Sequence, residues 1–462
     1  MVSGGMTLPL ARLMRLLMLF TLLGFAAARP ALAQSVLRDS ETEMLFRDIS
    51  RPLVEAAGLD PKTNVVLLND PEINAFVAGG QTVYIQSGLL TASDNVGQLQ
   101  AVIAHELGHV AGGHAIRIED GASKASGITI ATLVLGALAI AAGAGDAGMG
   151  IMMAGQQAAM GKFLAFSRTQ ESSADLAGAK YLSAAGISGR GSIEFFKKLA
   201  NQEYRLAIYA KDSYGRTHPL STERVATLEG VMSKDPAWNR PVDPKLDARF
   251  QRVKAKLIGF VNPKLAVTRY PESDKSVPAH YARAYAYHVG AYPDKALTEA
   301  QALLAAEPGD PFFLELQGQI LLESGRPADA IAPLREAAER SGNHPLIAAM
   351  LGHSLIATEK SANFSEAKSV LKAAVNRDNE NPFAWYQLGI IYDREGDLPR
   401  AALATAERNN LEGNPKLALA SAMMALKGIP QGTPDYLRAQ DIAMVSRTEL
   451  RRKDKNFDKK NK

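Results

Sequence analysis

The first hundred residues alternate between apolar runs and polar turns in a pattern that predicts a small sheet packed on helices. Residues 34–62 are typical of a helix with one polar face. Asn64–Leu68 and Thr82–Gln86 are short apolar runs bounded by turn residues such as Gly79-Gly80, and they predict strands. The apolar run Leu99–Ala104 predicts a further helix. A small sheet packed on that helix is an α+β arrangement.

A long stretch of small and apolar residues follows these elements. Between Lys124 and Lys162 the only charged residue is Asp146, and most other residues are Ala, Gly, Ile, Leu or Met. Ala125–Gly145 is long enough to be considered as a membrane span, but its many Ala, Gly and Thr residues make it a weak one. We therefore expect a hairpin of small-residue helices over 125–161 that covers a site or touches a membrane surface, with a true span as the alternative.

The second half of the chain contains a repeat. Small residues recur at spacings of 34, 34 and 37, and an alanine follows each of them after 12, 12, 15 and 12 residues. The four pairs are Ala284 and Ala296, Gly318 and Ala330, Gly352 and Ala367, and Gly389 and Ala401. The longer third offset indicates a three-residue insertion around Ser361–Asn363. A period of 34 is that of tetratricopeptide repeats, which stack into a curved, concave binding surface. A generic helical bundle is the alternative.

The composition of the chain predicts where its remaining segments begin and end. A proline-punctuated connector of mixed charge is expected over 233–272, the repeats over 273–445, and a basic, disordered tail over 446–462. At the N-terminus, basic residues precede an apolar run that ends in Ala31-Leu32-Ala33. This pattern predicts a signal peptide over 1–33, cleaved near Ala33/Gln34, with an uncleaved anchor helix as the alternative.

Charge and cysteine content narrow the function. Cleavage after Ala33 would remove three arginines and no acid, which lowers the formal net charge from +4 to +1. A nearly neutral chain gives no support to nucleic-acid binding. The sequence contains no cysteine, so an exported form must be stabilised without disulfides. An export signal together with the lack of cysteine favours a bacterial periplasm.

The segment His105-Glu106-Leu107-Gly108-His109 continues the predicted helix of Leu99–Ala104. Residues four apart lie on one helix face, so the two imidazoles can hold one ion while Glu106 beside them activates water. This arrangement is typical of zinc peptidases and predicts one Zn²⁺ per chain. His114 is not expected to be a third ligand, because on a continued helix it points away from His105.

Glu171 is the better candidate for the third ligand. It lies four residues before Asp175 in a predicted helix over Gln170–Ala185, so both carboxylates face the same way. Glu171 could bind the metal while Asp175 accepts the N–H of a ligand histidine and sets its tautomer. A simple surface pair of acids is the alternative.

These motifs, with the strand motif Asn74–Gly80, resemble the gluzincin family that includes the CAAX prenyl protease and the heat-shock membrane protease. The export signal and the repeats make the chain similar to one periplasmic branch of that family. The resemblance implies that His105, His109 and Glu171 bind zinc and that Glu106 is the general base. It also implies that the strand near Gly80–Gln86 pairs with extended substrate.

The family also has a His-Pro element after the glutamate, matched here by His218-Pro219. The resemblance implies that His218 either steadies the oxyanion or occupies the open zinc position as a plug. Arg224 could hold that loop through an ion pair with a carboxylate.

We thus expect an α+β zincin-type metalloprotease domain over 34–232, followed by an all-α tetratricopeptide-repeat solenoid. The resemblance implies a periplasmic zinc endopeptidase for unfolded or stalled outer-membrane β-barrel proteins, whose repeats dock substrate or the assembly machinery. Two alternatives stay open. One is a chaperone or adaptor whose repeats act while the protease site is latent, and the other is a membrane-embedded protease anchored through 125–145.

Overall fold

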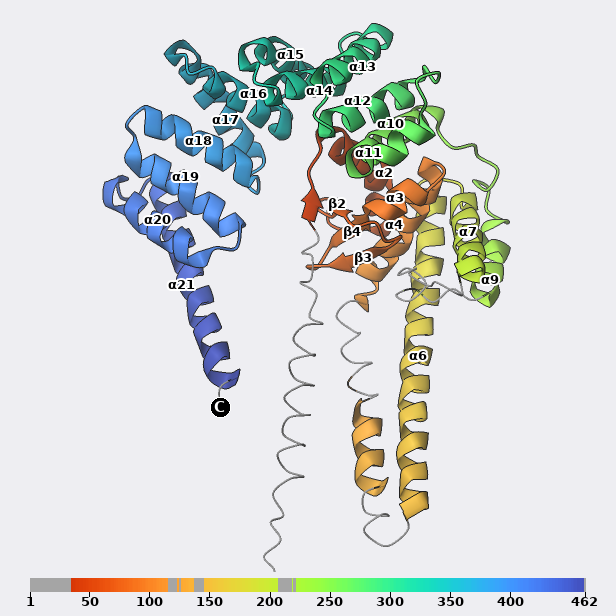
Figure 1. The fold of residues 1–462 in the computed structure, drawn as a ribbon. Helices are drawn as coiled ribbons and strands as arrows, with labels where there is room; N and C mark the ends of the chain where they lie inside the picture. Colours follow the sequence, from red (N-terminus) through yellow and green to blue (C-terminus); the bar gives the residue numbers. More distant parts are fainter. Residues whose placement is uncertain are drawn as a thin grey trace, which may run out of the picture.

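The computed structural model describes residues 35–114, 123, 126–136, 145–206, 218 and 222–460. The predicted signal peptide, residues 1–33, lies outside them. A small sheet covered by helices forms the first domain, and a curved stack of helices forms the second (Figure 1).

A four-stranded sheet forms the base of the first domain. Its strands are β1 (Ser35–Leu37), β2 (Asn64–Asn69), β3 (Ala75–Ala78) and β4 (Thr82–Gln86). The strand order is β1-β2-β4-β3, in which the central strands β2 and β4 are parallel and each outer strand is antiparallel to its neighbour. The two strands expected from the sequence are confirmed as the central pair, and β3 forms one edge of the described sheet.

Helices cover this sheet and bury a common core. The helices with assigned bounds are α2 (Ser40–Ala57), α3 (Ser87–Ala92), α4 (Val96–Ala111), α6 (Gly145–Ala184), α7 (Arg190–Leu206) and α9 (Thr222–Met232). Residues from α2, β4, α4 and α7 meet in the core, where Ile49, Ile85, Ile103 and Phe195 are fully buried. The predicted α+β arrangement is confirmed.

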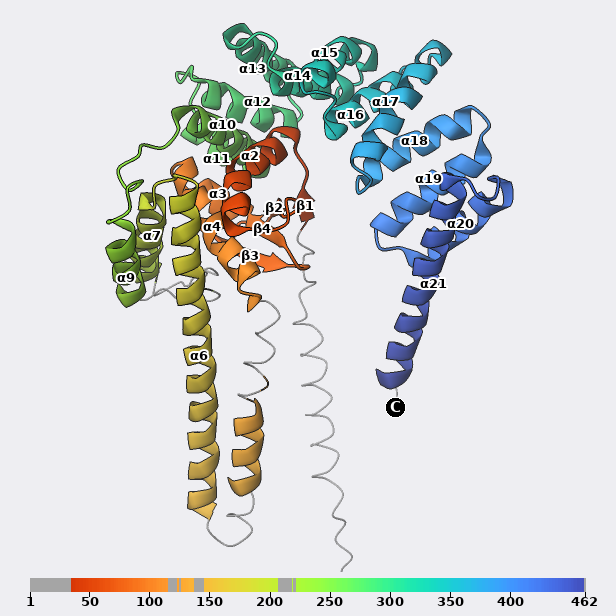
Figure 2. The ribbon, with the colours of Figure 1, turned by 180° about the vertical axis from the view of Figure 1, so that it is seen from behind.

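Helix α6 extends far beyond the body of the domain and lies beside a helical segment at 126–136 (Figures 1 and 2). The two helices touch where Thr132 packs against Gly155. The hairpin expected over 125–161 is therefore present in its described parts, while residues 137–144 lie outside them. Within the described ranges, no helix has both the length and the apolar character needed to cross a membrane.

The segment expected to be a connector is largely helical. It contains α10 (Pro244–Val261) and α11 (Pro263–Arg269), and in both the proline occupies the first turn, where no backbone N–H is needed. One face of α10 places Phe250 and Val253 in the core of the first domain. Another face packs Ala255 and Ile258 against the first helices of the solenoid. Two of the prolines that suggested a connector, Pro244 and Pro263, therefore begin helices, and α10 belongs to both cores.

The solenoid is a series of paired helices. They are α12 (Val277–Val289), α13 (Pro293–Ala306), α14 (Pro311–Glu323), α15 (Pro327–Arg340), α16 (Pro345–Ala357), α17 (Phe364–Arg377), α18 (Pro382–Arg394), α19 (Leu398–Leu411), α20 (Pro415–Gly428) and α21 (Pro434–Lys460). A Cβ at Gly318 would lie 2.4 Å from Leu334 Cγ, so this repeat position must be small for its helices to pack. The expected insertion at Ser361–Asn363 forms a 3-10 turn.

The C-terminal tail differs from the expectation. The tail was expected to be disordered over 446–462, but it is helical as far as Lys460, since α21 continues through it.

A buried polar cluster joins the start of α2 to the solenoid. Lys256 of α10 is 4 % exposed, and its Nζ lies 2.8 Å from Asp39 Oδ1 and 2.8 Å from Glu41 Oε2. The hydroxyl of Tyr281 in α12 donates to the same Glu41 oxygen at 2.8 Å. Ser40 donates a hydrogen bond to Glu315 of α14. The N-terminal end of α2 is thus fixed between the two domains.

Candidate metal centre

Helix α4 presents the first half of the site. Its first turn is capped by Asn95, whose side chain accepts from the Gln98 N–H. His105 and Glu106 are 3 % and 1 % exposed, so both side chains point into the domain. The Nε2 atoms of His105 and His109 lie 3.1 Å apart, as expected for side chains four residues apart on one face.

Helix α6 crosses α4 closely and supplies the second half. At the crossing, a Cβ on Gly108 would lie 2.6 Å from the carbonyl oxygen of Ala174. A Cβ on Gly178 would lie 3.1 Å from the backbone of Ala104. Small residues on both helices therefore allow backbone-to-backbone contact. This contact brings Glu171 to the histidines, with its carboxylate oxygens 3.4 Å from Nε2 of His105 and 3.4 Å from Nε2 of His109.

The spacing of these donor atoms fits a zinc ion. Donors about 2.0 Å from a tetrahedral zinc are about 3.3 Å from one another. The two histidine Nε2 atoms are 3.1 Å apart; that of His105 lies 3.4 Å from Glu171 Oε2, and that of His109 lies 3.4 Å from Glu171 Oε1. Two imidazoles and one carboxylate are also a ligand set of catalytic zinc sites, which keep a fourth position open. The residues present therefore fit one zinc.

Asp175 and Arg224 support the ligands from behind. Nδ1 of His105 lies 2.9 Å from Asp175 Oδ1, so its proton is directed to Asp175 and Nε2 is left to face the other ligands. The Arg224 guanidinium contacts both oxygens of Asp175. Its Nη2, which contacts Asp175 Oδ1, also lies 3.0 Å from Glu171 Oε2. The ring of Phe196 lies against the guanidinium, 5.5 Å from its central carbon.

The electrostatics of this cluster favour a positive charge between the carboxylates. Burial lowers the pKa of His105, but its hydrogen bonds with Asp175 and Glu171 outweigh burial and raise that pKa to about 10. Burial raises the pKa of Asp175, and the hydrogen bonds from Arg224 and His105 outweigh it, so the pKa is lowered. The pKa of Glu171 is lowered in the same way by the three histidines. Both carboxylates are therefore ionised and ready to stabilise a cation.

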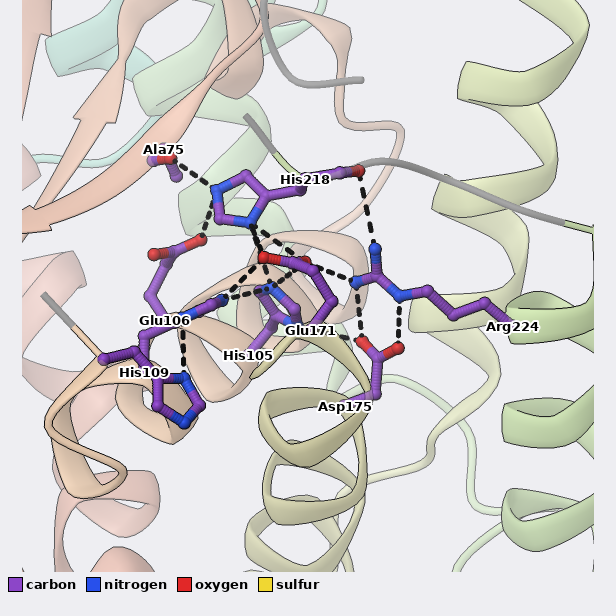
Figure 3. A network of polar contacts seen from close by, with 9 residues as sticks. Ala75, His105, Glu106, His109, Glu171, Asp175, His218 and Arg224 are labelled. Atoms are coloured by element: carbon purple, nitrogen blue, oxygen red, sulfur yellow. Dashed lines mark hydrogen bonds and ion pairs between the residues drawn. The ribbon is translucent and has the colours of Figure 1, made fainter. Parts of the chain in front are cut away.

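His218 lies over the open side of the three ligands (Figure 3). Its Nδ1 is 3.3 Å from His105 Nε2 and 3.1 Å from Glu171 Oε1, and it belongs with the ligands to one group of donor atoms within 4.8 Å of one another. Its Nε2 lies 3.3 Å from the carbonyl oxygen of Ala75, to which it can donate. With the proton on Nε2, the lone pair of Nδ1 faces the ligands.

One carboxylate oxygen of Glu106 lies beside His218. Its Oε1 is buried without a hydrogen-bond partner among the described residues, and it lies 3.6 Å from His218 Nε2. A buried carboxylate oxygen without a donor is costly, which is typical of a group whose partner is a reactant. The site can thus bind one metal ion and present a base beside it.

The structure brings together the seven residues singled out by sequence, which are His105, Glu106, His109, Glu171, Asp175, His218 and Arg224. His114 is not in the metal cluster. It is 5 % exposed, and its Nδ1 lies 3.0 Å from Nδ1 of His109, on the far side of that ring from the metal position.

One expectation is corrected. The strand at 82–86 is β4, which pairs with β2 on one side and β3 on the other, so no edge of it is left for a substrate. The edge nearest the site is β3, whose Ala75 carbonyl contacts His218. Sequence reasoning missed this role of Ala75 because strand order is set by long-range pairing. The sequence did contain one signal for this strand, the motif Asn74–Gly80, but the resemblance gave that motif no role in the site.

Comparisons with known proteins agree with this geometry. Residues 14–232 match the profile of "Peptidase family M48", and residues 281–345 and 357–414 match that of "Tetratricopeptide repeat". Among curated proteins, the chain is 27 % identical over 386 residues to the beta-barrel assembly-enhancing protease of Escherichia coli K12, covering 80 % of this chain and 76 % of the relative.

Other relatives match a smaller share of the chain. The chain is 33 % identical over 168 residues to the metalloprotease LoiP of Escherichia coli K12, covering 36 % of this chain and 60 % of that protein. It is 28 % identical over 230 residues to the mitochondrial metalloendopeptidase OMA1 of Saccharomyces cerevisiae, covering 44 % and 61 %. Among solved structures, the tetratricopeptide-repeat protein YrrB aligns with 39 % of this chain and 94 % of its own, at 22 % identity and a TM-score of 0.31.

Proposed function

We propose, from the premise that the chain is a zinc metalloendopeptidase built from a peptidase family M48 domain and tetratricopeptide repeats, that it works in the periplasm on outer-membrane proteins. Its substrates in this proposal are unfolded or stalled β-barrel polypeptides, and the repeats dock substrate or the assembly machinery. The name of the relative that covers 80 % of this chain and the predicted signal peptide over 1–33 support the proposal. The observation that carries it is the His105, His109, Glu171 cluster with Glu106 beside it.

We assign the chemistry as follows. His105, His109 and Glu171 would hold a zinc ion, which when bound would supply Lewis-acid chemistry, namely polarisation of the scissile carbonyl and acidification of water. Glu106 accepts the proton of the attacking water and passes it to the leaving amine, for which its unpartnered Oε1 is suited. Asp175 keeps the His105 tautomer that directs Nε2 to the metal.

The extended substrate adds to the edge of β3 in this proposal. An edge strand offers free backbone groups to a peptide, which gains affinity through main-chain hydrogen bonds. The Ala75 carbonyl accepts from His218 Nε2 at 3.3 Å, so a substrate N–H would compete with His218 for this oxygen.

Two roles for His218 were open, and the geometry favours the plug. Its Nδ1 lies at the open side of the ligands, its Nε2 lies near Glu106, and its ring contacts the β3 edge. Arg224 donates to the His218 carbonyl at 3.4 Å and so holds the loop in place. In this state the fourth metal position, the base and the edge strand are all covered. In this proposal the enzyme is latent while His218 occupies the fourth metal position.

The test of the activity is Glu106→Gln, with Glu223→Gln on α9 as the matched control. We expect the Glu106 variant to retain one zinc per chain by elemental analysis and to lose about 10²- to 10⁴-fold of its cleavage of a denatured β-barrel polypeptide. The control should cleave like the native chain. Cleavage that persists in the Glu106 variant would refute the assignment.

The test of the plug is His218→Ala, compared with His353→Ala in the solenoid. We expect basal cleavage to rise by about tenfold or more while zinc content is unchanged, because removal of the imidazole frees the fourth position. A role in steadying the oxyanion predicts a fall instead. The adaptor alternative would be supported if neither the native chain nor the His218 variant cleaves, while both keep a denatured β-barrel polypeptide from aggregating.

A further inference from the structure

The hairpin formed by 126–136 and the outer half of α6 exposes an unusual amount of apolar surface. In the first helix Ile130, Leu133, Val134 and Leu135 are 62, 48, 55 and 56 % exposed. Because Leu133, Val134 and Leu135 are consecutive on a helix, they point in different directions and no face of that helix is polar. Soluble proteins rarely leave contiguous apolar surface of this kind uncovered.

The outer half of α6 continues this surface. Met149, Met153 and Met160 are 54, 63 and 56 % exposed. Gly155 is turned toward the first helix, where Thr132 fills the space beside it, and Ala159, four residues further on, is buried. The hairpin thus uses its small residues for its own packing and turns its large apolar side chains outward, as helix pairs in lipid do.

Charge is confined to the two ends of the hairpin. The sequence has no charged residue from 147 to 161, and the first charges toward the body of the domain are Lys162 and Arg168, both exposed. No acid occurs between Asp146 and Glu171, so the charges of α6 nearest its outer half, Lys162 and Arg168, are both basic. Basic residues beside an apolar segment match the anionic headgroups of a bilayer.

We propose that this hairpin docks the protein on an anionic lipid bilayer, lying within the headgroup and outer acyl region without crossing it. An isotropic apolar medium accounts for exposed apolar side chains on every side of a helix, whereas a protein partner covers one face and leaves the others in water. The inference is independent of the proposed cleavage.

This docking would set the position of the active site. Met149 and Glu171 are separated by 22 residues of one continuous helix, which corresponds to about 33 Å along its axis. The metal centre would therefore work beside the membrane surface, at a distance set by α6.

The experiment is vesicle flotation of the exported full-length chain, whose N-terminus is determined by mass spectrometry. Vesicles of phosphatidylethanolamine with phosphatidylglycerol are compared with vesicles of phosphatidylcholine. The test variant combines Leu133→Gln, Leu135→Gln, Met153→Gln and Met160→Gln. The matched control changes two leucines and two methionines of the solenoid that are equally exposed, Leu417→Gln, Leu437→Gln, Met424→Gln and Met444→Gln, at 56, 53, 64 and 61 %.

We expect the native chain and the control to float with anionic vesicles, and the hairpin variant to lose about tenfold or more in partition coefficient. Lys162→Gln with Arg168→Gln should weaken binding to the anionic vesicles and leave the weaker binding to phosphatidylcholine unchanged. The Glu106→Gln variant should float like the native chain, so a failed cleavage assignment does not affect this result.

Several outcomes overturn the proposal. These are a native chain that does not float, and a hairpin variant that floats as well as the control. A native dimer that the hairpin substitutions dissociate, measured by light scattering without lipid, would assign the surface to a second copy. Loss of binding to a urea-denatured β-barrel polypeptide without lipid, with flotation unchanged, would assign it to substrate.

Discussion

Replacing Gly108 by alanine tests whether the α4–α6 crossing builds the metal centre. The new Cβ would lie 2.6 Å from the carbonyl oxygen of Ala174 and 2.9 Å from its Cα, and both contacts are with backbone that no rotamer change can move. Ordinary carbon contacts begin at about 3.5 Å, so the helices must separate by roughly 1 Å. Glu171 is one helical turn from Ala174 and would move with it.

The expected magnitude follows from this displacement. A metal site tolerates ligand displacements of about 0.2 Å, so a shift of this size should lower zinc affinity by at least about tenfold. Overpacking costs about 1–3 kcal/mol of the free energy of unfolding. The gain in helix propensity from Gly to Ala, about 1 kcal/mol, offsets only part of it.

The assays are zinc competition with a chromogenic chelator and thermal unfolding. The control is Gly161→Ala in α6, the helix that carries Glu171, where a Cβ would meet nothing within 4 Å. We expect the control to keep native zinc affinity and to gain up to about 1 kcal/mol in stability. The two variants should thus move the unfolding temperature in opposite directions. Native zinc affinity and stability in the Gly108 variant would refute the argument that this glycine is required by the crossing.

Two further predictions concern buried carboxylates. Asp175→Asn should lower zinc affinity about 10- to 100-fold, measured by the same competition, because the neutral amide holds the His105 tautomer less firmly; an unchanged affinity would contradict the role of Asp175. Burial, together with the charge of Asp39, raises the pKa of Glu315 to about 8, so the native state holds this proton more tightly than the unfolded chain does. The stability contributed by this group is complete below its unfolded pKa of about 4.5 and is lost as the pH rises through about 8. Glu315→Gln should therefore reduce the fall in unfolding temperature between about pH 5 and pH 9, and an equal fall in both proteins would count against the buried cluster.

The site was predictable where local helix geometry determines it. The spacings of His105 with His109 and of Glu171 with Asp175 each place two side chains on one face, and the zinc ligand rule then pairs the two helices. The close crossing that joins them depends on Gly108 and Ala174, which are far apart in sequence and have no chemistry of their own. Nothing in either local pattern shows that they touch.

The fold was less predictable where long-range pairing or proline chemistry decides it. The parallel pairing of β2 with β4 places β3 at the edge, an order that hydrophobic patterns do not show. Pro244 and Pro263 suggested a connector, although proline is favoured in the first turn of a helix. The repeat was clear from sequence because its small residues recur where helices pack, as at Gly318.

Helix α10 lies outside the part of the chain that matches the protease family, yet it belongs to the packed core of the protease domain. The match to peptidase family M48 ends at residue 232, whereas Phe250 and Val253 of α10 complete the core of that domain. A catalytic fragment cut at the family boundary would expose this core to water and should not fold. A fragment that keeps α10 would expose the face that Ala255 and Ile258 present to the solenoid. Helix α10 therefore packs into the cores of both domains, so neither domain can be cut away without exposing an apolar face of this helix.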